Sequence, residues 1–246
     1  MKREYVELSA RLKRIADMVS AGNVVCDVGC DHGFVSIYLM QKQIATKVYA
    51  MDVRKGPLDR AKEHIEAYGL AEKIETRLSD GVEKLCVGEA EAMVLAGMGG
   101  KLMQKILSEG RDKCQSMKEL VLGPQSEVAQ FRAFLRKEGY QIVEEDMILE
   151  DGKFYPILKV EPTGNSLEGF VYGEASEEEQ ALFDEFGPLL LRGKNPILYK
   201  YLDFLQGLNE EILNNLSSAQ GEGAKVRKVQ VEEDLYKIAK AREYFK

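Results

Sequence analysis

The stretch "VVCDVGCDHGF", residues 24–34, carries the signal of a buried strand directly into a turn rich in glycine and acids. The apolar run predicts a short β-strand. The turn then supplies Asp27, Gly29, Asp31 and Gly33 at alternate positions. Glycines let the backbone approach a ligand closely, whereas an acid at position 31 would repel the pyrophosphate of a dinucleotide. The turn therefore favours a ligand that carries positive charge and no phosphate.

The segments around this turn alternate between predicted strands and helices. Helical spacing covers residues 8–19 and about 34–42, and Pro57 suits the first turn of a helix that runs to about Tyr68. Two more helices are predicted at about 101–109 and at 126–139, the latter with Ser126 as its N-cap. The predicted strands are 24–28, 47–53, 74–80, 92–97 and 119–123, and two strands around Asp151-Gly152 form a closing hairpin. This order predicts a mostly parallel, doubly wound α/β sheet.

The composition changes after about residue 162. Residues 163–179 are polar and contain glycine, which is typical of a linker or an edge. Helices are then predicted at 177–193, 195–219 and 226–245, with a turn at 221–223. The last two helices predict a hairpin that resembles an antiparallel coiled coil. We therefore predict two domains, a ligand-binding domain over residues 1–163 and a helical domain over residues 164–246.

The composition is that of an ordinary globular protein of 246 residues with a net charge of −7. No apolar run is long enough to cross a bilayer, and no apolar core follows the charged N-terminus as in a secretory signal. We therefore expect a cytoplasmic protein with no membrane partner. The four cysteines and two histidines lack the spacing of a metal site, so we expect neither a metal nor a disulfide.

The charge distribution bears on nucleic-acid binding. The acidic total argues against a broadly basic surface. The first 14 residues nevertheless hold five cations against two acids, and "KVRK", 225–228, adds three more cations. Each of these basic segments is typical of a solvated face, but a local basic surface at the N-terminal helix or on the helical domain stays open.

Three acids fall at or near the ends of successive predicted strands. Asp27 lies in the first strand, Asp52 ends the second, and Asp80 ends the third. Ligands of open α/β sheets bind beyond the carboxyl ends of the strands, where an acid after the second strand can accept the ribose hydroxyls. Asp80 is expected to accept from an adenine amino group. One such Asp would suggest a helix cap, but three at neighbouring strands favour a cofactor site.

These residues lead to a resemblance. The first 160 or so residues resemble class I S-adenosylmethionine-dependent methyltransferases. Nearly the whole chain is similar to the bacterial tRNA (adenine-22-N1)-methyltransferase family. The similarity rests on "LSARLKRIADMV", "DVGCDHGFVSIYL", "MDVRKGPLDRAKEHI", "RLSDGVEKL" and "VLAGMGGKLM". The pair Asp31-His32 in place of the usual middle glycine is itself a family feature. One departure is "VLGPQSE", 121–127, where the family has a Leu-Gln-Pro-Asn-like turn.

The resemblance implies a Rossmann-like class I methyltransferase fold with a closing β-hairpin and a helical, coiled-coil-like C-terminal domain. It implies S-adenosylmethionine as cofactor and tRNA as partner, with methyl transfer to N1 of an adenine, expected to be adenine 22. The cofactor-binding residues carried over are Asp27, Gly29, Cys30, Asp31, His32, Gly33, Asp52, Val53, Ser79, Asp80, Gly81, Ala96 and Gly97.

The resemblance also points to "AGMGG", where many adenine methyltransferases have an Asn-Pro-Pro-aromatic motif. Gly97, Met98 and Gly99 are the residues expected at the reacting base, with Met98 packing on it. His32 is equally compatible with a proton relay and with a structural role. Two other functions stay open, a small-molecule methyltransferase of the same fold and a non-catalytic cofactor-binding scaffold. The oligomeric state, monomer or homodimer, also stays open.

Overall fold

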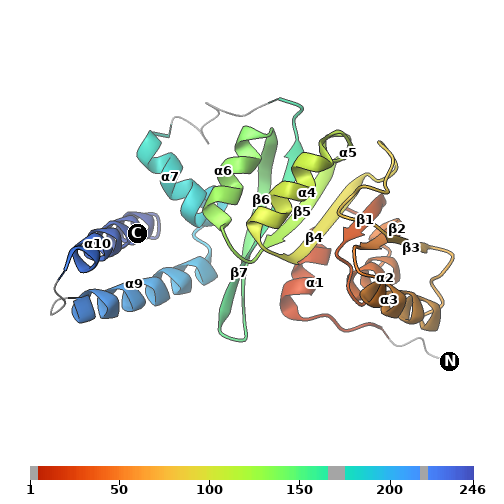
Figure 1. Cartoon of the computed structure of the whole chain (residues 1–246), viewed down its shortest axis with the longest axis horizontal. Coiled ribbons are helices and arrows are strands. Elements are labelled where there is room, and N and C mark those ends of the chain that lie inside the picture. Colours follow the sequence, from red (N-terminus) through yellow and green to blue (C-terminus); the bar gives the residue numbers. More distant parts are fainter. Residues whose placement is uncertain (1–4, 166–174, 217–220) are drawn as a thin grey trace. The chain divides into compact units, whose positions relative to one another are not determined.

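The computed structural model describes residues 5–165, 175–216 and 221–246 (Figure 1). Its internal contacts divide the chain into two compact units, Met1–Phe170 and Val171–Lys246. Each unit is considered by itself below. The domain boundary between residues 163 and 164 stays a prediction, and most of the predicted linker lies outside the described residues. None of the described helices is both long enough and apolar enough to cross a membrane.

The first unit is built on a seven-stranded sheet with the order β3-β2-β1-β4-β5-β7-β6. Strand β7 runs antiparallel to both of its neighbours, and the other neighbouring strands are parallel. Asp151 and Gly152 join β6 to β7 with φ of 50° and 73°, the left-handed conformation that a two-residue hairpin requires. The predicted doubly wound sheet with its closing hairpin is therefore confirmed. The strands are β1 Asn23–Val28, β2 Ala45–Asp52, β3 Ile74–Leu78, β4 Ala92–Met98, β5 Glu119–Pro124, β6 Tyr140–Glu150 and β7 Lys153–Pro162.

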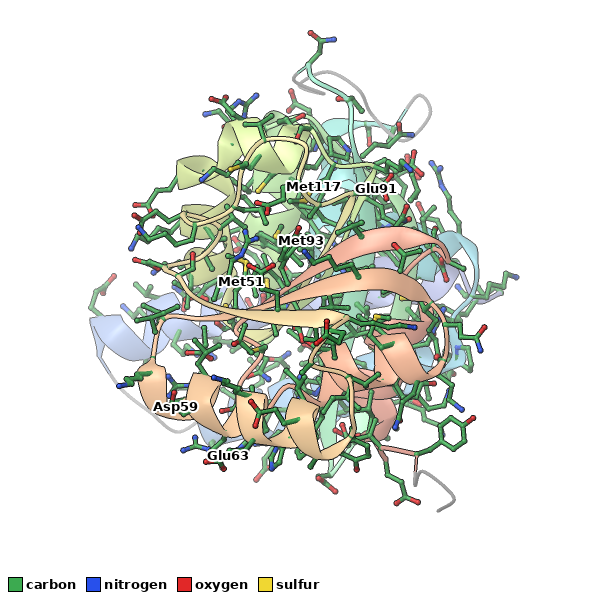
Figure 2. All side chains as sticks on the ribbon, turned by 90° about the vertical axis from the view of Figure 1, so that its right-hand side faces the viewer. Met51, Asp59, Glu63, Glu91, Met93 and Met117 are labelled. Atoms are coloured by element: carbon green, nitrogen blue, oxygen red, sulfur yellow. The ribbon has the colours of Figure 1, made fainter. Side chains whose placement is uncertain are left out.

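Helices cover both faces of this sheet because successive strand side chains point to opposite sides. One face packs Ala50, Val94 and Val121 into a core with side chains of α1, α2 and α3. The opposite face carries Met51 and Met93, which Figure 2 shows with Met117 on the side of α4 and α5. The helices of this unit are α1 Ala10–Asp17, α2 Phe34–Gln41, α3 Lys55–Ala67, α4 Gly100–Glu109, α5 Arg111–Gln115 and α6 Val128–Lys137.

The second unit is helical, as predicted, and the coiled-coil detail stays a prediction. Its helices are α7 Glu177–Phe186, α8 Pro188–Arg192, α9 Pro196–Leu216 and α10 Glu222–Glu243. Helices α9 and α10 pack against each other. The single helix expected over 177–193 is wrong, because Gly187 adopts φ of 92° and Pro188 has no N–H to continue the helical bonds.

Several element boundaries differ from the sequence predictions by a few residues. Strand β3 ends at Leu78, because the Ser79 hydroxyl donates to Gly81 O and accepts from Lys84 N and so closes a turn. Asp80 therefore lies in this turn and not at the strand end. Ser126 does not cap α6, because its hydroxyl pairs with the Glu127 carboxylate and Glu127 itself occupies the N-cap. Helix α10 begins inside the predicted turn at 221–223.

Candidate functional site

A cavity of about 440 Å³ lies at the carboxyl ends of β1, β2 and β4. All the predicted cofactor residues except Gly33 line it, and so does Met98 of the predicted catalytic trio. Gly99 is not among the lining residues. The lining residues are Arg11, Leu12, Asp27, Val28, Gly29, Cys30, Asp31, His32, Phe34, Val35, Asp52, Val53, Arg54, Ser79, Asp80, Gly81, Ala96, Gly97, Met98, Leu102 and Ile106.

The turn after β1 is tied to the end of β2. The backbone amides of Gly29 and Cys30 both donate to the carbonyl of Met51, at 2.8 and 2.9 Å. Gly29 has φ of 75°, and a Cβ built on it would stand 2.2 Å from Cε of Met98. Asp31 also adopts a left-handed conformation, with φ of 48°. The turn thus presents bare backbone to the cavity, as the glycine pattern predicts.

Asp52 offers a fixed carboxylate at the end of β2. Its side chain is 4% exposed. Oδ1 accepts from the amide of Arg54 at 2.8 Å, and Oδ2 accepts from the amide of Asp31 at 3.4 Å. These bonds orient the carboxylate and leave it lone pairs for further donors, because each oxygen accepts more than one hydrogen bond. Arg54 also places its Nε 3.6 Å from Oδ1.

Asp27 is the most deeply buried acid of the lining. Its Oδ2 accepts from the Ser36 hydroxyl at 2.6 Å. Burial raises the pKa of Asp27 to about 6, and the nearby Asp52 charge adds to the rise, while the Ser36 hydrogen bonds oppose it. A cation placed in the cavity would favour the ionised form of Asp27. The cavity therefore suits a positively charged ligand.

The third wall is the turn after β3. Ser79 is buried, and its amide donates to the carbonyl of Asp52 at 2.9 Å, which joins this turn to the end of β2. Asp80 is exposed, and its Oδ2 lies 3.6 Å from Nζ of Lys105. Although Asp80 lies beyond the strand, the turn still brings it to the cavity.

The end of β4 is held by the segment "VLGPQSE". Gln125 N donates to Met98 O at 2.9 Å, and Gly100 N donates to Ser126 O at 2.9 Å. The Gln125 side chain comes close to the chain here, since its Nε2 lies 3.9 Å from a Cβ built on Gly97. A Cβ on Gly99 would stand 2.6 Å from Oγ of Ser126, so glycine there permits close packing of the two segments.

Gly33 and His32 have structural contacts. Gly33 is the N-cap of α2 with φ of 74°, and a Cβ there would stand 3.1 Å from Cβ of Ala61. It lets α2 approach α3. The His32 ring stacks on the rings of Phe34 and His64, at centroid distances of 5.8 and 5.7 Å. His64 Nδ1 lies 3.0 Å from the carbonyl oxygen of His32. These contacts support a structural role for His32, which also lines the cavity.

Sequence reasoning missed the parts of the lining that come from helices. Leu102 and Ile106 face the cavity from α4, and their i, i+4 spacing is the signal that identifies them as one face. Arg11 and Leu12 come from α1, where only the total basic charge drew attention. Lys13 and Arg14 of the same helix are in ion pairs, Lys13 with Asp17 and Arg14 with Glu144 and Asp146.

Among the described residues, no group of three or more His, Cys, Asp or Glu side chains is arranged to hold a metal ion. The four cysteines are free, and burial raises the pKa of the Cys30 thiol well above its ordinary value. The neutral Cys30 thiol is therefore a packing group at neutral pH, not a nucleophile.

The chain is similar to known proteins over most of its length. A family model described as a methyltransferase domain matches residues 8–158. The tRNA (adenine(22)-N(1))-methyltransferase of Bacillus subtilis is 33% identical over 211 residues, which are 84% of this chain and 86% of that protein. The crystal structure of the B. subtilis m1A22 tRNA methyltransferase matches with a TM-score of 0.81 at 29% identity, covering 96% of this chain and 99% of that chain.

A further solved structure is that of the Streptococcus pneumoniae protein Sp1610 in complex with S-adenosyl-L-methionine. It matches with a TM-score of 0.79 at 29% identity, and the match covers 96% of this chain and 99% of that chain. The Rossmann-like methyltransferase fold predicted from the sequence is confirmed by these matches.

Proposed function

The chain belongs to the family of tRNA (adenine(22)-N(1))-methyltransferases, and on that basis we propose that it transfers a methyl group from S-adenosylmethionine to N1 of an adenine in tRNA, adenine 22. The observation that carries the proposal is the convergence of Asp27, Asp52 and Asp80 on one cavity with the glycine-containing turns after β1 and β4. Three acids around bare backbone match the chemistry of this cofactor, which carries a sulfonium and an ammonium and no phosphate.

We assign different residues of the cavity to the ribose, the adenine and the methionine end of the cofactor. Asp52 is the proposed acceptor for the ribose hydroxyls, because its carboxylate is buried and already oriented by two backbone amides. The turn that holds Ser79, Asp80 and Gly81 is assigned to the adenine end. The turn from Gly29 to Asp31 is assigned to the methionine end, where acids compensate positive charge. His32, Val53 and Ala96 complete the proposed contacts from the same lining.

The proposed reaction needs alignment more than a strong base. S-adenosylmethionine supplies an electrophilic methyl group on its sulfonium. Adenine N1 carries an in-plane lone pair, so the protein must orient the base and exclude water. Gly97 and Met98 line the cavity at the end of β4. There the glycine backbone lets a base approach, and the Met98 side chain packs on it. Gly99 supports this segment through its close packing on Ser126.

A tRNA substrate adds two requirements. The adenine must leave its stack to reach the cavity, and cationic side chains must contact phosphates. We propose that the second unit supplies such contacts, because Lys225, Arg227 and Lys228 are all exposed at the start of α10. A tRNA substrate also makes the cytoplasm the proposed location.

The test is methylation of one tRNA transcript in two forms, with adenine 22 and with another base at that position. Labelled methyl transfer to the first form alone is the expected result. Transfer to both forms would overturn the assigned position. Cofactor binding without transfer to any tRNA would favour the non-catalytic scaffold, and transfer to small molecules alone would favour the other methyltransferase.

A further inference from the structure

Gly97 forms a bulge at the end of β4, on the rim of the cavity. In the pairing of β4 with β5, Ala96 lies opposite Gly123 and Met98 lies opposite Pro124, so Gly97 is an extra residue in β4. It has φ of 78°, is exposed, and lines the cavity. Bulges redirect the chain beside functional sites. Here the bulge presents bare backbone at the place where the proposed substrate base enters.

A side-chain amide from the next strand stands beside this bulge. The segment "AGMGG", 96–100, has no side-chain amide of its own. Gln125 follows β5, and its backbone amide donates to the carbonyl of Met98 at 2.9 Å, which ties it to the end of β4. Its Nε2 lies 3.9 Å from a Cβ built on Gly97. The Gln125 side chain is exposed, and neither end of its amide has a hydrogen-bond partner in the part of the chain that the structure describes.

The polar groups that follow Gln125 are already paired. The Ser126 hydroxyl is hydrogen-bonded to the Glu127 carboxylate, and the Ser126 carbonyl accepts from the amide of Gly100 at 2.9 Å. Glu127 Oε1 also lies 3.9 Å from Nζ of Lys101. These contacts fix the segment around Gln125 while its own amide stays free for a ligand. An amide carries both an acceptor and donors, so it can recognise a base edge that presents one of each.

Methylation at N1 restricts the edge by which the protein can hold an adenine. N1 must face the methyl group, so the protein must recognise the base through other atoms. Adenine presents its N6 amine and N7 together on another edge, and a glutamine amide matches this pair, since Oε1 accepts from N6 and Nε2 donates to N7. We propose that Gln125 binds this edge and so selects adenine and directs its N1 into the cavity. This inference rests on the proposed function and adds a residue that contacts the substrate base.

The contact should become stronger during the reaction. As the bond from N1 to the methyl carbon forms, the carbon–sulfur bond breaks and its electron pair stays on sulfur. The positive charge passes to the base, which shares it with the N6 amine. The amine then becomes a better donor to Oε1 of Gln125, so this contact stabilises the transition state more than the bound substrate. Loss of the amide should therefore lower kcat as well as raise KM for tRNA.

The test compares two forms of one tRNA transcript, with adenine or 7-deazaadenine at position 22. The second base has a C–H group in place of N7 and keeps both N1 and the N6 amine. The unmodified full chain should methylate the adenine form with a kcat/KM about fivefold higher, because the other form lacks one hydrogen bond. Gln125→Met, which removes the amide at similar length, should lower kcat/KM for the adenine form at least about tenfold and should not distinguish the two forms. Gln125→Glu, which keeps an acceptor for N6 but has no donor for N7, should retain more activity than Gln125→Met and also lose the preference for adenine.

Gln130→Met is the matched control, because it removes an exposed amide from α6, outside the lining of the cavity. It should keep both the rate and the preference for adenine. The proposal is overturned if Gln125→Met still prefers adenine to 7-deazaadenine, or if it weakens S-adenosylmethionine binding measured by calorimetry without RNA, which would assign the amide to the cofactor. An unmodified protein that methylates neither transcript would contradict the proposed function itself, a result distinct from these.

Discussion

The Cε atom of Met98 occupies the space in which a side chain at Gly29 would begin, 2.2 Å from the position of its Cβ. This contact joins the turn after β1 to the end of β4, two segments about 70 residues apart in the chain. The two turns therefore form one wall, and a change in either one alters the surface that the other presents to the cavity.

Gly29→Ala should displace the Met98 methyl group from this position. The new Cβ would collide with Met98 and would also force a left-handed conformation on a non-glycine residue, at roughly 1–2 kcal/mol. We expect S-adenosylmethionine affinity to fall at least about tenfold by calorimetry, because the bare backbone is lost. Gly22→Ala is the control, since Gly22 has φ of 94° and nothing within 4 Å of its Cβ position. If both variants bind S-adenosylmethionine normally, the assignment of its methionine end to the Gly29 turn is wrong.

Asp52→Ala should weaken cofactor binding while the fold is retained. The variant would lose the two hydrogen bonds that we propose Asp52 accepts from the ribose, each worth roughly 1.5–3 kcal/mol when one partner is charged. We expect affinity to fall at least about tenfold. Asp59→Ala is the control, because Asp59 is exposed on α3 with Glu63 (Figure 2). Unchanged affinity in the Asp52 variant, with the same melting temperature as the control, would exclude the ribose assignment.

The raised pKa of Asp27 makes a prediction about stability. The pKa of this acid rises from an ordinary 3.8 to about 6 in the folded protein, chiefly through burial. The folded state therefore holds the proton more tightly than the unfolded state. The contribution of Asp27 to stability is intact below about pH 4 and is lost as pH rises through about 6, by an amount of order 3 kcal/mol.

Asp27→Asn removes this titration, so a comparison of the variant with the wild type separates the effect of Asp27 from that of the other acids. Unfolding free energies are measured by denaturant titration without cofactor. Between about pH 4 and 6 the wild type should become less stable relative to the variant, and above pH 7 the difference should stay constant. A difference that does not change over this window would show that Asp27 titrates normally. A difference that moves in favour of the wild type would mean that its carboxylate is stabilised when ionised.

The start of α10 should contribute to RNA affinity. Within the part of the chain that the structure describes, Lys225 and Lys228 pair only with exposed acids of the same helix, each at 3.8 Å, and such pairs hold their cations weakly. Replacing Lys225, Arg227 and Lys228 by Gln should lower tRNA affinity roughly tenfold at low salt and reduce the salt slope by about one for each lost phosphate contact. S-adenosylmethionine affinity should not change.

The control for this surface removes three acids of the same helix, with Glu232 and Glu233 replaced by Gln and Asp234 by Asn. It should leave tRNA affinity unchanged or raise it, because the helix becomes more positive. Filter binding measures the tRNA affinity of each variant. If both triple variants bind tRNA as tightly as the unmodified protein, the RNA-binding surface belongs to the first unit.

The sequence predicted the acids of the site because parallel strands bring their carboxyl ends to one edge, so Asp27 and Asp52 follow from strand order alone. Helical contributions such as Leu102 were not predicted, since the rotation of a helix about its axis depends on packing. The break at Gly187 was missed because the local pattern also fits a continuous helix. The cap at Glu127 was missed because Ser126 is an equally plausible N-cap. The resemblance supplied Ser79 and Ala96, which no spacing rule identifies.

The pairing of α1 with the β6–β7 hairpin also sets an order of assembly. The amide of Arg11 bonds to Glu150 across 139 residues, and the Arg14 side chain bonds to Asp146 across 132 residues. Because a chain is synthesised from its N-terminus, α1 is made before the hairpin and can form these contacts only once the hairpin has been made. Asp27, Asp52 and Asp80 all lie within the first 80 residues and are synthesised earlier. The wall of the cavity that contains Arg11 therefore takes its final form only after residues 146–150 have been synthesised, because the contacts that hold α1 come from them.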